Sequence, residues 1–498
     1  MVLTSVQRGA PALGVALLVV GCAVGPDFVR PPAPETKDYE SGGMPQPAVS
    51  EPTETQQRFT VGQKISNDWW QLFRSPRLEG VLQETIAGSQ TLAAAKTTLA
   101  QAQQGVLQAA GAYYPQVDFA AGAQRQRVNF ASIGINQQGP ILNLFSIGPT
   151  VSYAVDIFGG YRRRVEQQQA LAEYQGWELD AAYLTLTGNA VTQALQIASA
   201  RAQIAAVETI IADDQRNLDL VRTELRAGEA TQIDVESAAS QFAADRTLLP
   251  PLRQQLSVAR HALSVLSGRA PGDWAPPDFD LAEFTLPEEL PVSLPSELVR
   301  QRPDILAAEA QLHAASAAVG VATAQLYPSL NLTASFEQFA VKPSKLFVPQ
   351  ASIFDVGGNL LAPIFHGGTL RAEKQAAVDA FDGAFANYKQ TVLTSFGQVA
   401  DVLQALSHDG ELLEAEHRAL DSAEESLRLT RTTYSYGNVG ILQVLDAQRL
   451  AEQARLGYVR AQAQRYLDTV QLLTAMGGGW WQSQDQTAQA TTPVKATR

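Results

Sequence analysis

The sequence predicts an all-α chain with a small transmembrane β part, built from a tandem duplication. Residues 114–119 (YPQVDF) recur as residues 327–332 (YPSLNL), and the pattern around them recurs as well. Each copy is expected to contain a helix, two alternating strands, one very long helix, a glycine turn and a returning helix. This order is unusual for a soluble globular domain and therefore bears on function.

The N-terminal residues predict a lipoprotein signal peptide over residues 1–21. An apolar run over residues 10–21, too short to span a bilayer, follows Arg8 and ends at Cys22, the only cysteine in the chain. We therefore expect Cys22 to be the lipidated first residue, with this covalent lipid in place of any cofactor. The alternative is a buried cysteine behind an ordinary N-terminus.

Composition narrows the function classes. Of the 498 residues, 17% are charged and 45% are apolar, and the net charge is −13, so nucleic acid is not an expected partner. Beyond the signal peptide we find no apolar run that approaches the length of a spanning helix. Any further membrane crossing must then use β-strands.

The first repeat is placed at residues 67–270, after an extended, Pro-rich leader at residues 22–66. A helix with coiled-coil spacing is predicted from Leu92 until Pro115 ends it, and the apolar period then changes to two. Strands are expected at about 116–130 and 146–158 in this repeat, and at about 329–341 and 352–365 in the second.

Each predicted strand has one apolar and one polar face. The apolar faces include Val117, Val151, Ala334 and Val356, and aromatic residues flank the strands at both ends, as girdles flank a membrane band. Two hairpins packed on a soluble core would show the same alternation. We favour the membrane because no amphipathic helix is placed to cover the apolar faces.

A proline-free helix should follow from residue 160 to about Arg226, with Gly228 ending it and Thr231 capping the next helix. Pro250 and Pro251 should kink or restart the returning helix. A Pro-rich equatorial linker at residues 271–295 leads to the second repeat at residues 296–478, and the tail at 479–498 is expected to be disordered.

Four amphipathic strands cannot close a barrel, and an open sheet edge in lipid leaves backbone groups unpaired. The chain should therefore oligomerise. Two copies would make a narrow, filled eight-stranded barrel, whereas three copies would make a twelve-stranded barrel with a lumen. Small residues along the long helices favour their packing side by side into a hollow tube below this barrel.

Several short motifs, in order along nearly the whole chain, carry a family resemblance. They are GPDFVRPP at 25–32, DWWQLF at 68–73, LPPL at 249–252, RPDI at 302–305, LDAQR at 445–449 and MGGGW at 476–480. With them the chain resembles the outer-membrane efflux proteins of the TolC/OprM type, in their lipoprotein branch. An alanine after Cys22 resembles the signal that releases bacterial lipoproteins to the outer membrane.

The resemblance implies a TolC-like homotrimer in the outer membrane of a Gram-negative bacterium, with a twelve-stranded barrel and a periplasmic helical tunnel. Such proteins are passive exit ducts, not enzymes. They work with a periplasmic adaptor protein and an inner-membrane efflux transporter of the resistance-nodulation-division type.

The resemblance also implies a gate at the periplasmic tip, formed here by Tyr434, Asp446 and Arg449. A solvated helix face is the alternative for these charges. Glu224 and Asp234 are weaker counterparts in the first repeat. The expected adaptor-contact turns contain Gly228, Thr231, Gly437 and Gly440.

No catalytic or metal site is expected, because the five histidines include no pair at ligand spacing and no catalytic motif occurs. The basic run at residues 162–164 is interpreted as a solvated charge run, with lipid headgroups as the alternative partner. A second hypothesis for the whole chain is a periplasmic adaptor without a pore, although adaptors carry one helical hairpin rather than two.

Overall fold

The computed structural model describes residues 23–43, 57–63, 65–129, 134 and 136–478. Cys22, the signal peptide and the tail at 479–498 lie outside the described residues. The chain divides into two compact units, which we describe separately. The first contains residues 23–30, 99–175 and 308–388, and the second contains the described remainder.

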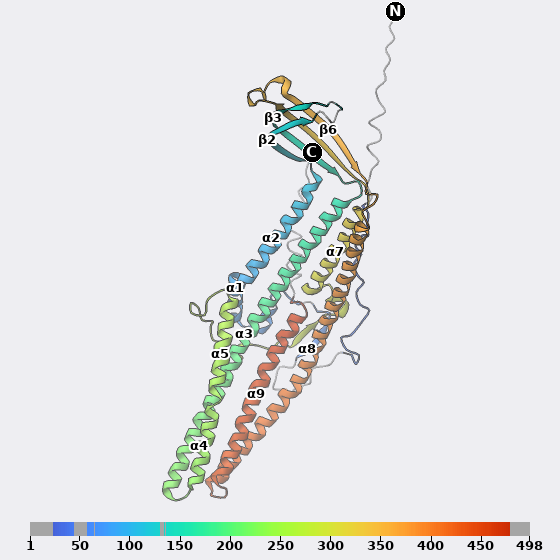
Figure 1. The fold of residues 1–498 in the computed structure, drawn as a ribbon. Helices are drawn as coiled ribbons and strands as arrows, with labels where there is room; N and C mark the ends of the chain where they lie inside the picture. The colour runs from blue at the N-terminus through green and yellow to red at the C-terminus, as the bar shows by residue number, and fades with distance from the viewer. Residues whose placement is uncertain (1–22, 44–56, 64, 130–133, 135, 479–498) are drawn as a thin grey trace, which may run out of the picture. The chain divides into compact units, whose positions relative to one another are not determined.

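Most of the chain is helical. The helices are α1 (Pro76–Gly88), α2 (Gln90–Ala110), α3 (Gly160–Ala227), α4 (Gln232–Arg246), α5 (Leu249–Leu266), α6 (Pro295–Leu298), α7 (Pro303–Ala324), α8 (Thr369–Ser435) and α9 (Ile441–Ala475) (Figure 1). The two very long helices, α3 and α8, have 68 and 67 residues. The helix that returns from α3 restarts as α5, with its prolines in the first turn, where the missing N–H groups cost nothing.

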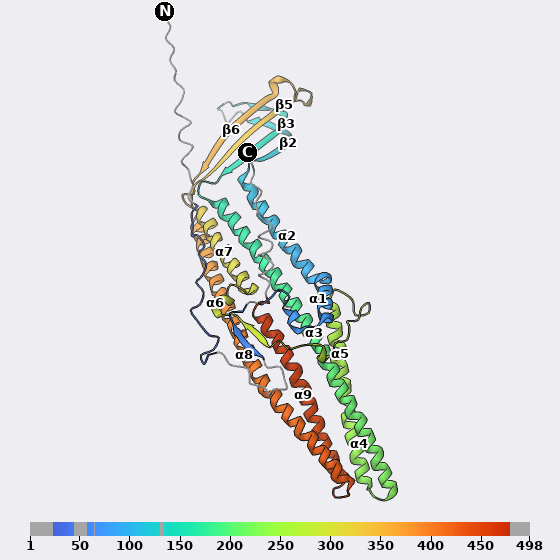
Figure 2. The ribbon, with the colours of Figure 1, turned by 180° about the vertical axis from the view of Figure 1, so that it is seen from behind.

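Four strands make one antiparallel sheet in the first unit, in the order β2-β3-β5-β6. They are β2 (Gln116–Asn129), β3 (Gln138–Val155), β5 (Ser329–Ala340) and β6 (Ser352–Leu361), and they lie side by side in Figures 1 and 2. The N-terminal bound of β3 precedes the expected position near residue 146, because residues 138–145 continue the antiparallel ladder with the far end of β2.

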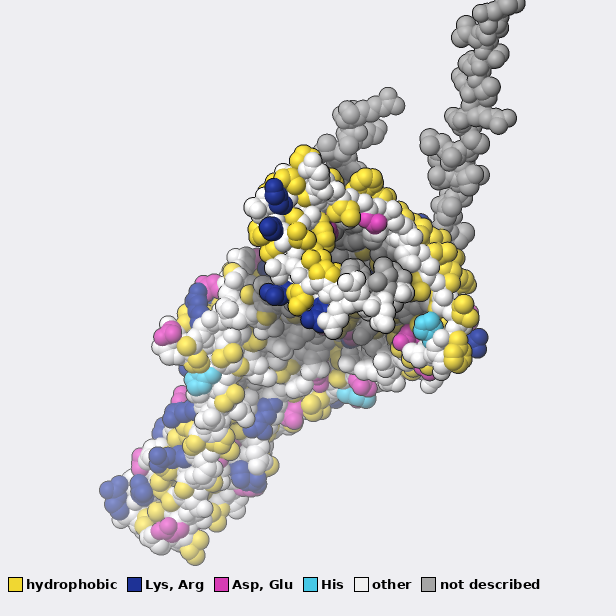
Figure 3. Space-filling view, turned by 45° about the horizontal axis from the view of Figure 1, so that its top comes forward, with side chains coloured by type: hydrophobic (Ala, Val, Ile, Leu, Met, Phe, Trp, Pro, Cys, Tyr) yellow, Lys and Arg dark blue, Asp and Glu magenta, His cyan; other side chains and the backbone are white. Residues whose placement is uncertain are grey.

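The strand register confirms the predicted faces. Val117 pairs with Val151, Val151 with Ala334, and Ala334 with Val356, so one apolar row crosses the sheet. The next row is polar and contains Asp118, Thr150, Ser335 and Asp355. Phe119 and Val356 are 70% and 77% exposed, and Figure 3 shows hydrophobic side chains gathered over the curved sheet. The apolar face is thus uncovered within the described chain.

The N-terminal segment at residues 23–30 is fastened to the first unit by a buried arginine. Arg163 on α3 is 5% exposed and donates to the carbonyl oxygens of Val24 and Gly25 and to the carboxylate of Asp27 at 2.6 Å. It also pairs with Glu166 at 2.8 Å. The prediction that this basic run is solvated is therefore wrong for Arg163, whose charge is compensated inside the fold.

Two further contacts hold the same segment against α7. Arg30 pairs with Glu309 at 2.5 Å, and the Phe28 ring stacks on His313 with 4.4 Å between ring centroids. Gly25 has φ +95°, and a Cβ there would collide with the backbone of Gly320. Glycine is therefore needed at residue 25 for both its conformation and its close approach.

The second unit has a large core of helix side chains around η1 (Trp69–Phe73), a 3₁₀ helix. Trp69 and Phe73 are buried there with Leu195 of α3, Leu263 of α5 and Leu403 of α8. Beside this core, β1 (Arg58–Val61) pairs in parallel with β4 (Glu289–Val292). These two short strands were not predicted, because they lie in the segments interpreted as the extended leader and the linker.

Helix α7 corrects one statement of the sequence analysis. By length and composition, residues 303–324 would suffice to cross a membrane, although we found no such run there. However, 61% of its most apolar stretch is buried inside the structure, as in a core helix. Its apolar character comes largely from alanine, which permits close packing with neighbouring helices.

Candidate functional site

The candidate site lies in the second unit, where two helical hairpins turn. The α3–α4 turn and the α8–α9 turn lie beside each other in Figures 1 and 2. Leu218 and Val221 of α3, Val235 of α4, and Ile441 and Val444 of α9 form a small buried cluster between the helix ends. This packing fixes the positions of the polar residues described below.

Both turns have the same backbone geometry, as expected for a duplication. Gly228 and Gly437 follow the long helices with φ of +81° and +74°, in the left-handed region that favours glycine. Their following residues close equivalent hydrogen bonds, from Glu229 N to Glu224 O and from Asn438 N to Thr433 O. Each long helix thus ends in a Schellman-type turn.

The helices that leave the turns begin differently. Thr231 and Asp234 form a capping box at the start of α4, with the Asp234 carboxylate accepting from Thr231 N at 2.8 Å. These hydrogen bonds from Thr231 lower the pKa of Asp234. Gly440 is the N-cap of α9, has φ −85° and makes no side-chain cap.

Tyr434 joins the two hairpins. Its hydroxyl group, near the end of α8, donates a hydrogen bond to the carboxylate of Glu224 near the end of α3. Burial is the main cause that raises the pKa of Tyr434, followed by the Glu224 hydrogen bond and the negative charges of Glu224, Glu229 and Asp234. The hydroxyl therefore keeps its proton and remains a donor.

Asp446 and Arg449 both lie on α9 and contact each other. Arg449 Nη2 is 2.7 Å from Asp446 Oδ1, and Arg449 also donates to Gln453 one turn further on. Among the described residues, the hydrogen bonds and ion pairs of these two side chains stay on α9. A role for this pair in closing the tip therefore depends on contacts with a neighbouring copy of the chain.

The buried polar residue of the same motif, Gln448, was not among the residues predicted from the sequence. Gln448 donates to Asp214 on α3 at 3.0 Å and to Glu452 on α9 at 2.8 Å. Its own oxygen accepts from Asn217 and from Arg431 on α8. The signal was present, because Asp214 interrupts an apolar helix stripe between Ile210 and Leu218.

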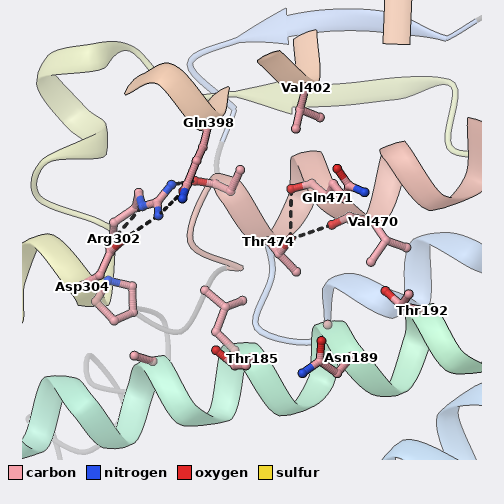
Figure 4. Close-up of a pocket in the computed structure, with 15 residues that line it drawn as sticks. Thr185, Asn189, Thr192, Arg302, Asp304, Gln398, Val402, Val470, Gln471 and Thr474 are labelled. Atoms are coloured by element: carbon pink, nitrogen blue, oxygen red, sulfur yellow. Dashed lines mark hydrogen bonds and ion pairs between the residues drawn. The ribbon is translucent and has the colours of Figure 1, made fainter. Parts of the chain in front are cut away.

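In the same unit, Arg302 and its hydrogen-bond partners line a cavity of about 530 Å³ (Figure 4). Arg302 binds Asp304 through two nitrogens at 2.6 and 3.0 Å, and it donates to Gln398 of α8 at 2.8 Å. It also donates to the carbonyl of Ala475 at the C-terminus of α9, where a cation satisfies free carbonyl groups. This arginine of the RPDI motif thus ties the start of α7 and the end of α9 to the middle of α8.

Comparison with known proteins decides the family. A family described as outer membrane efflux protein matches residues 81–269 and 294–478, one match for each repeat. The chain belongs to the outer membrane efflux protein family. It is therefore the outer-membrane channel of a tripartite efflux system and not an enzyme, and the alternative of a periplasmic adaptor is set aside.

Individual relatives agree with the family match. The chain is 32% identical to the pyoverdine export outer membrane protein OpmQ of Pseudomonas aeruginosa over 83% of this chain and 87% of that protein. It is 26% identical to the cation efflux system protein CusC of Escherichia coli over 94% and 98% of the two chains.

Solved structures confirm the TolC-like fold. The outer-membrane channel OprN matches with a TM-score of 0.83 and 25% identity, covering 92% of this chain and all of that one. The CmeC outer membrane channel of Campylobacter jejuni matches with a TM-score of 0.84 and 21% identity over 96% of this chain and all of that one.

Proposed function

We propose that three copies of the chain close a twelve-stranded barrel through the outer membrane. The observation that supports this most directly is the sheet order, which leaves β2 and β6 as edge strands with one exposed apolar face. Each unpaired edge group would cost several kcal/mol in lipid, so pairing β2 of one copy with β6 of the next is strongly favoured.

The long helices continue this pore as a periplasmic tunnel, and its tip is the gate. Tyr434 holds α8 against α3 within one chain. Asp446 and Arg449 are exposed on α9, where three copies would form a ring of charges around the axis. Crowding three aspartates is unfavourable unless Arg449 lies close to each of them, so the pair both lines and holds the closed tip.

The partners follow from the same arrangement. A periplasmic adaptor docks at the two turns, through the segments that contain Gly228 and Thr231 in one and Gly437 and Gly440 in the other. An inner-membrane transporter supplies the energy, and the duct itself is passive. One named relative is a pyoverdine export protein and the other a cation efflux protein, so membership of the family does not fix the cargo of this channel. We assign cargo selection to the transporter.

The proposed organisation also includes a lipid anchor and two sequence repeats. Cys22 carries the lipid that anchors the protein after removal of residues 1–21. The division into repeats at residues 67–270 and 296–478, with the linker at 271–295 between them, is consistent with the two family matches.

Ion current through a planar bilayer tests the gate. The purified chain should insert as a pore of low conductance, and Asp446→Ala combined with Arg449→Ala should raise that conductance several-fold. Arg222→Ala is the control, because this exposed arginine near the end of α3 pairs with Asp219 and is not one of the proposed gate residues. A double variant with unchanged conductance refutes the gating role, and a chain that never conducts refutes the channel.

A further inference from the structure

Three acidic side chains meet inside the second unit, away from the turns. They come from three helices, with Asp214 on α3, Asp245 on α4 and Glu452 on α9 (Figure 1). One carboxylate oxygen from each lies within 4.8 Å of the other two. Asp214 is only 2% exposed, so at least one of the three charges is fully removed from water.

The acidic positions belong to the packing faces of their helices. Asp214 lies between the buried Ile210 and Leu218, and Asp245 lies between Phe242 and Leu249, which pack against neighbouring apolar clusters. Apolar residues occupy such positions elsewhere on these helices. A carboxylate there is unfavourable unless something compensates its charge.

The surrounding hydrogen-bond donors do not satisfy all the oxygen atoms of the three carboxyl groups. Gln448 donates to Asp214 Oδ1 and to Glu452, and Gln241 donates to Asp245 Oδ2 at 2.6 Å. Asp214 Oδ2 is buried and has no hydrogen-bond partner among the described residues. The Asp214 carboxyl also lies close enough to Asp245 to share a proton with it, and that hydrogen bond raises the pKa of Asp214, so a proton and a cation compete for this group.

The charges around the group are mostly negative. Asp213, next along α3, adds a further carboxylate, although it pairs with Arg216. The positive charge of Arg431 on α8 lowers the pKa of Glu452, and its side chain donates a hydrogen bond to Gln448. Burial is the largest cause that raises the pKa of both Asp214 and Glu452, because water solvates neither carboxylate well.

We propose that Asp214, Asp245 and Glu452 form a site for a divalent cation of the calcium and magnesium class. Three oxygens within 4.8 Å of one another leave a common point no more than about 2.8 Å from each, close to the 2.3–2.6 Å of calcium–oxygen bonds. Purely oxygen ligands select a hard cation, and the absence of sulfur or imidazole argues against zinc or copper.

A cation bound here links both hairpins. It joins α3 and α4 of the first repeat to α9 of the second, on the side of the helices below the turns. The bound cation would cross-link the three helices and so stabilise the packing of the hairpins. This role is independent of the proposed gate, because no cation ligand is a gate residue.

The test compares calcium binding by the full-length chain and its variants in detergent after removal of metals with a chelator. Equilibrium dialysis with Ca²⁺, and separately with Mg²⁺, gives the number and affinity of sites. Asp214→Asn and Glu452→Gln should lose one site per chain or weaken it by at least about tenfold, because ligand charge sets affinity at such sites. Thermal unfolding with and without Ca²⁺ provides a second measurement.

Asp219→Asn is the matched control, because Asp219 also lies on α3 but its side chain is 60% exposed and pairs with Arg222. The wild type and this control should share one site and a rise in unfolding temperature with Ca²⁺ that both site variants lack. Equal binding by all four proteins overturns the proposal. So does the absence of binding to the wild type, or a stabilisation by acid alone with no response to either cation, which would assign protons to the group.

Discussion

Asp409 and Asp468 show how single residues can link this fold to pH. Both are buried in the second unit, on α8 and α9, with Arg465 as a nearby cation. The pKa of Asp409 is raised to about 8, mainly by burial and then by the hydrogen bond and charge of Asp468, while Arg465 opposes the rise. The folded chain therefore keeps a proton on Asp409 at neutral pH.

Asp409→Asn should reduce the pH dependence of stability. A carboxyl group whose pKa is raised in the folded state binds more protons when folded, so stability is highest at low pH and falls as the pH rises from about 4 to about 8. Asparagine cannot lose a proton, so the variant should gain stability relative to the wild type near pH 8. Chemical unfolding across this pH range is the measurement.

Asp401→Asn serves as the comparison for that experiment. Asp401 is exposed on the same helix, so its replacement should leave the pH profile as it is in the wild type. An Asp409→Asn profile that is as steep as the wild-type profile would contradict the assignment.

At the scale of elements, the two turns depend on glycine for different reasons. Gly437 needs a positive φ, whereas Gly440 has an ordinary φ and serves as the N-cap of α9. The same substitution should therefore have opposite effects at positions three residues apart.

Gly437→Ser should destabilise the α8–α9 turn by about 1–2 kcal/mol, because a side chain with a Cβ is strained in the left-handed region. Gly440→Ser should be neutral or slightly stabilising, since serine is a better N-cap than glycine. Hydrogen exchange of the α8–α9 turn measures both effects. Equal protection in the two variants would show that the turn does not require the conformation described.

At the scale of the whole molecule, the edge strands are expected to meet between copies. Asp118→Cys on β2, combined in turn with cysteine at residues 353, 355, 357 and 359 on β6, should give oxidised dimers and trimers for at least one combination. A series is needed because barrel closure staggers the register. Gel electrophoresis without reductant shows the products.

Thr150→Cys on the central strand β3, combined with the same β6 positions, provides the control, because β3 is already paired on both sides. Only monomers in every β2 combination would contradict closure by neighbouring copies. Abundant trimers with the β3 control would show that the cross-links are nonspecific.

Much of this architecture was predictable from the sequence because its signals are periodic. Alternation over Val117 and its neighbours placed the strands and their faces, and an uninterrupted helical pattern gave α3 nearly to the residue and indicated a very long counterpart, α8, in the second repeat. The pairing of β1 with β4 was not predictable, because each strand has four residues and their partners are far apart in the chain.

Sequence patterns were weaker for the polar contacts. Arg163 stands in a basic run that is typical of surface residues, and only the fold shows that Asp27 and Glu166 surround it. Asp214 was recognisable as a carboxylate in an apolar stripe, but its meeting with Asp245 and Glu452 depends on three separate helices. The roles of Tyr434, Asp446 and Arg449 stay predictions.

The contacts of residues 23–30 with the rest of the chain bear on the order in which the chain folds. Residues 23–30 leave the ribosome before either repeat, yet their contacts include Glu309, His313 and Gly320 in the second repeat. These contacts cannot form until more than half of the chain has been synthesised, whereas those with Arg163 of the first repeat can form earlier. A chain that stops before the second repeat would therefore hold residues 23–30 through Arg163 alone, without the ion pair of Arg30 or the ring contact of Phe28.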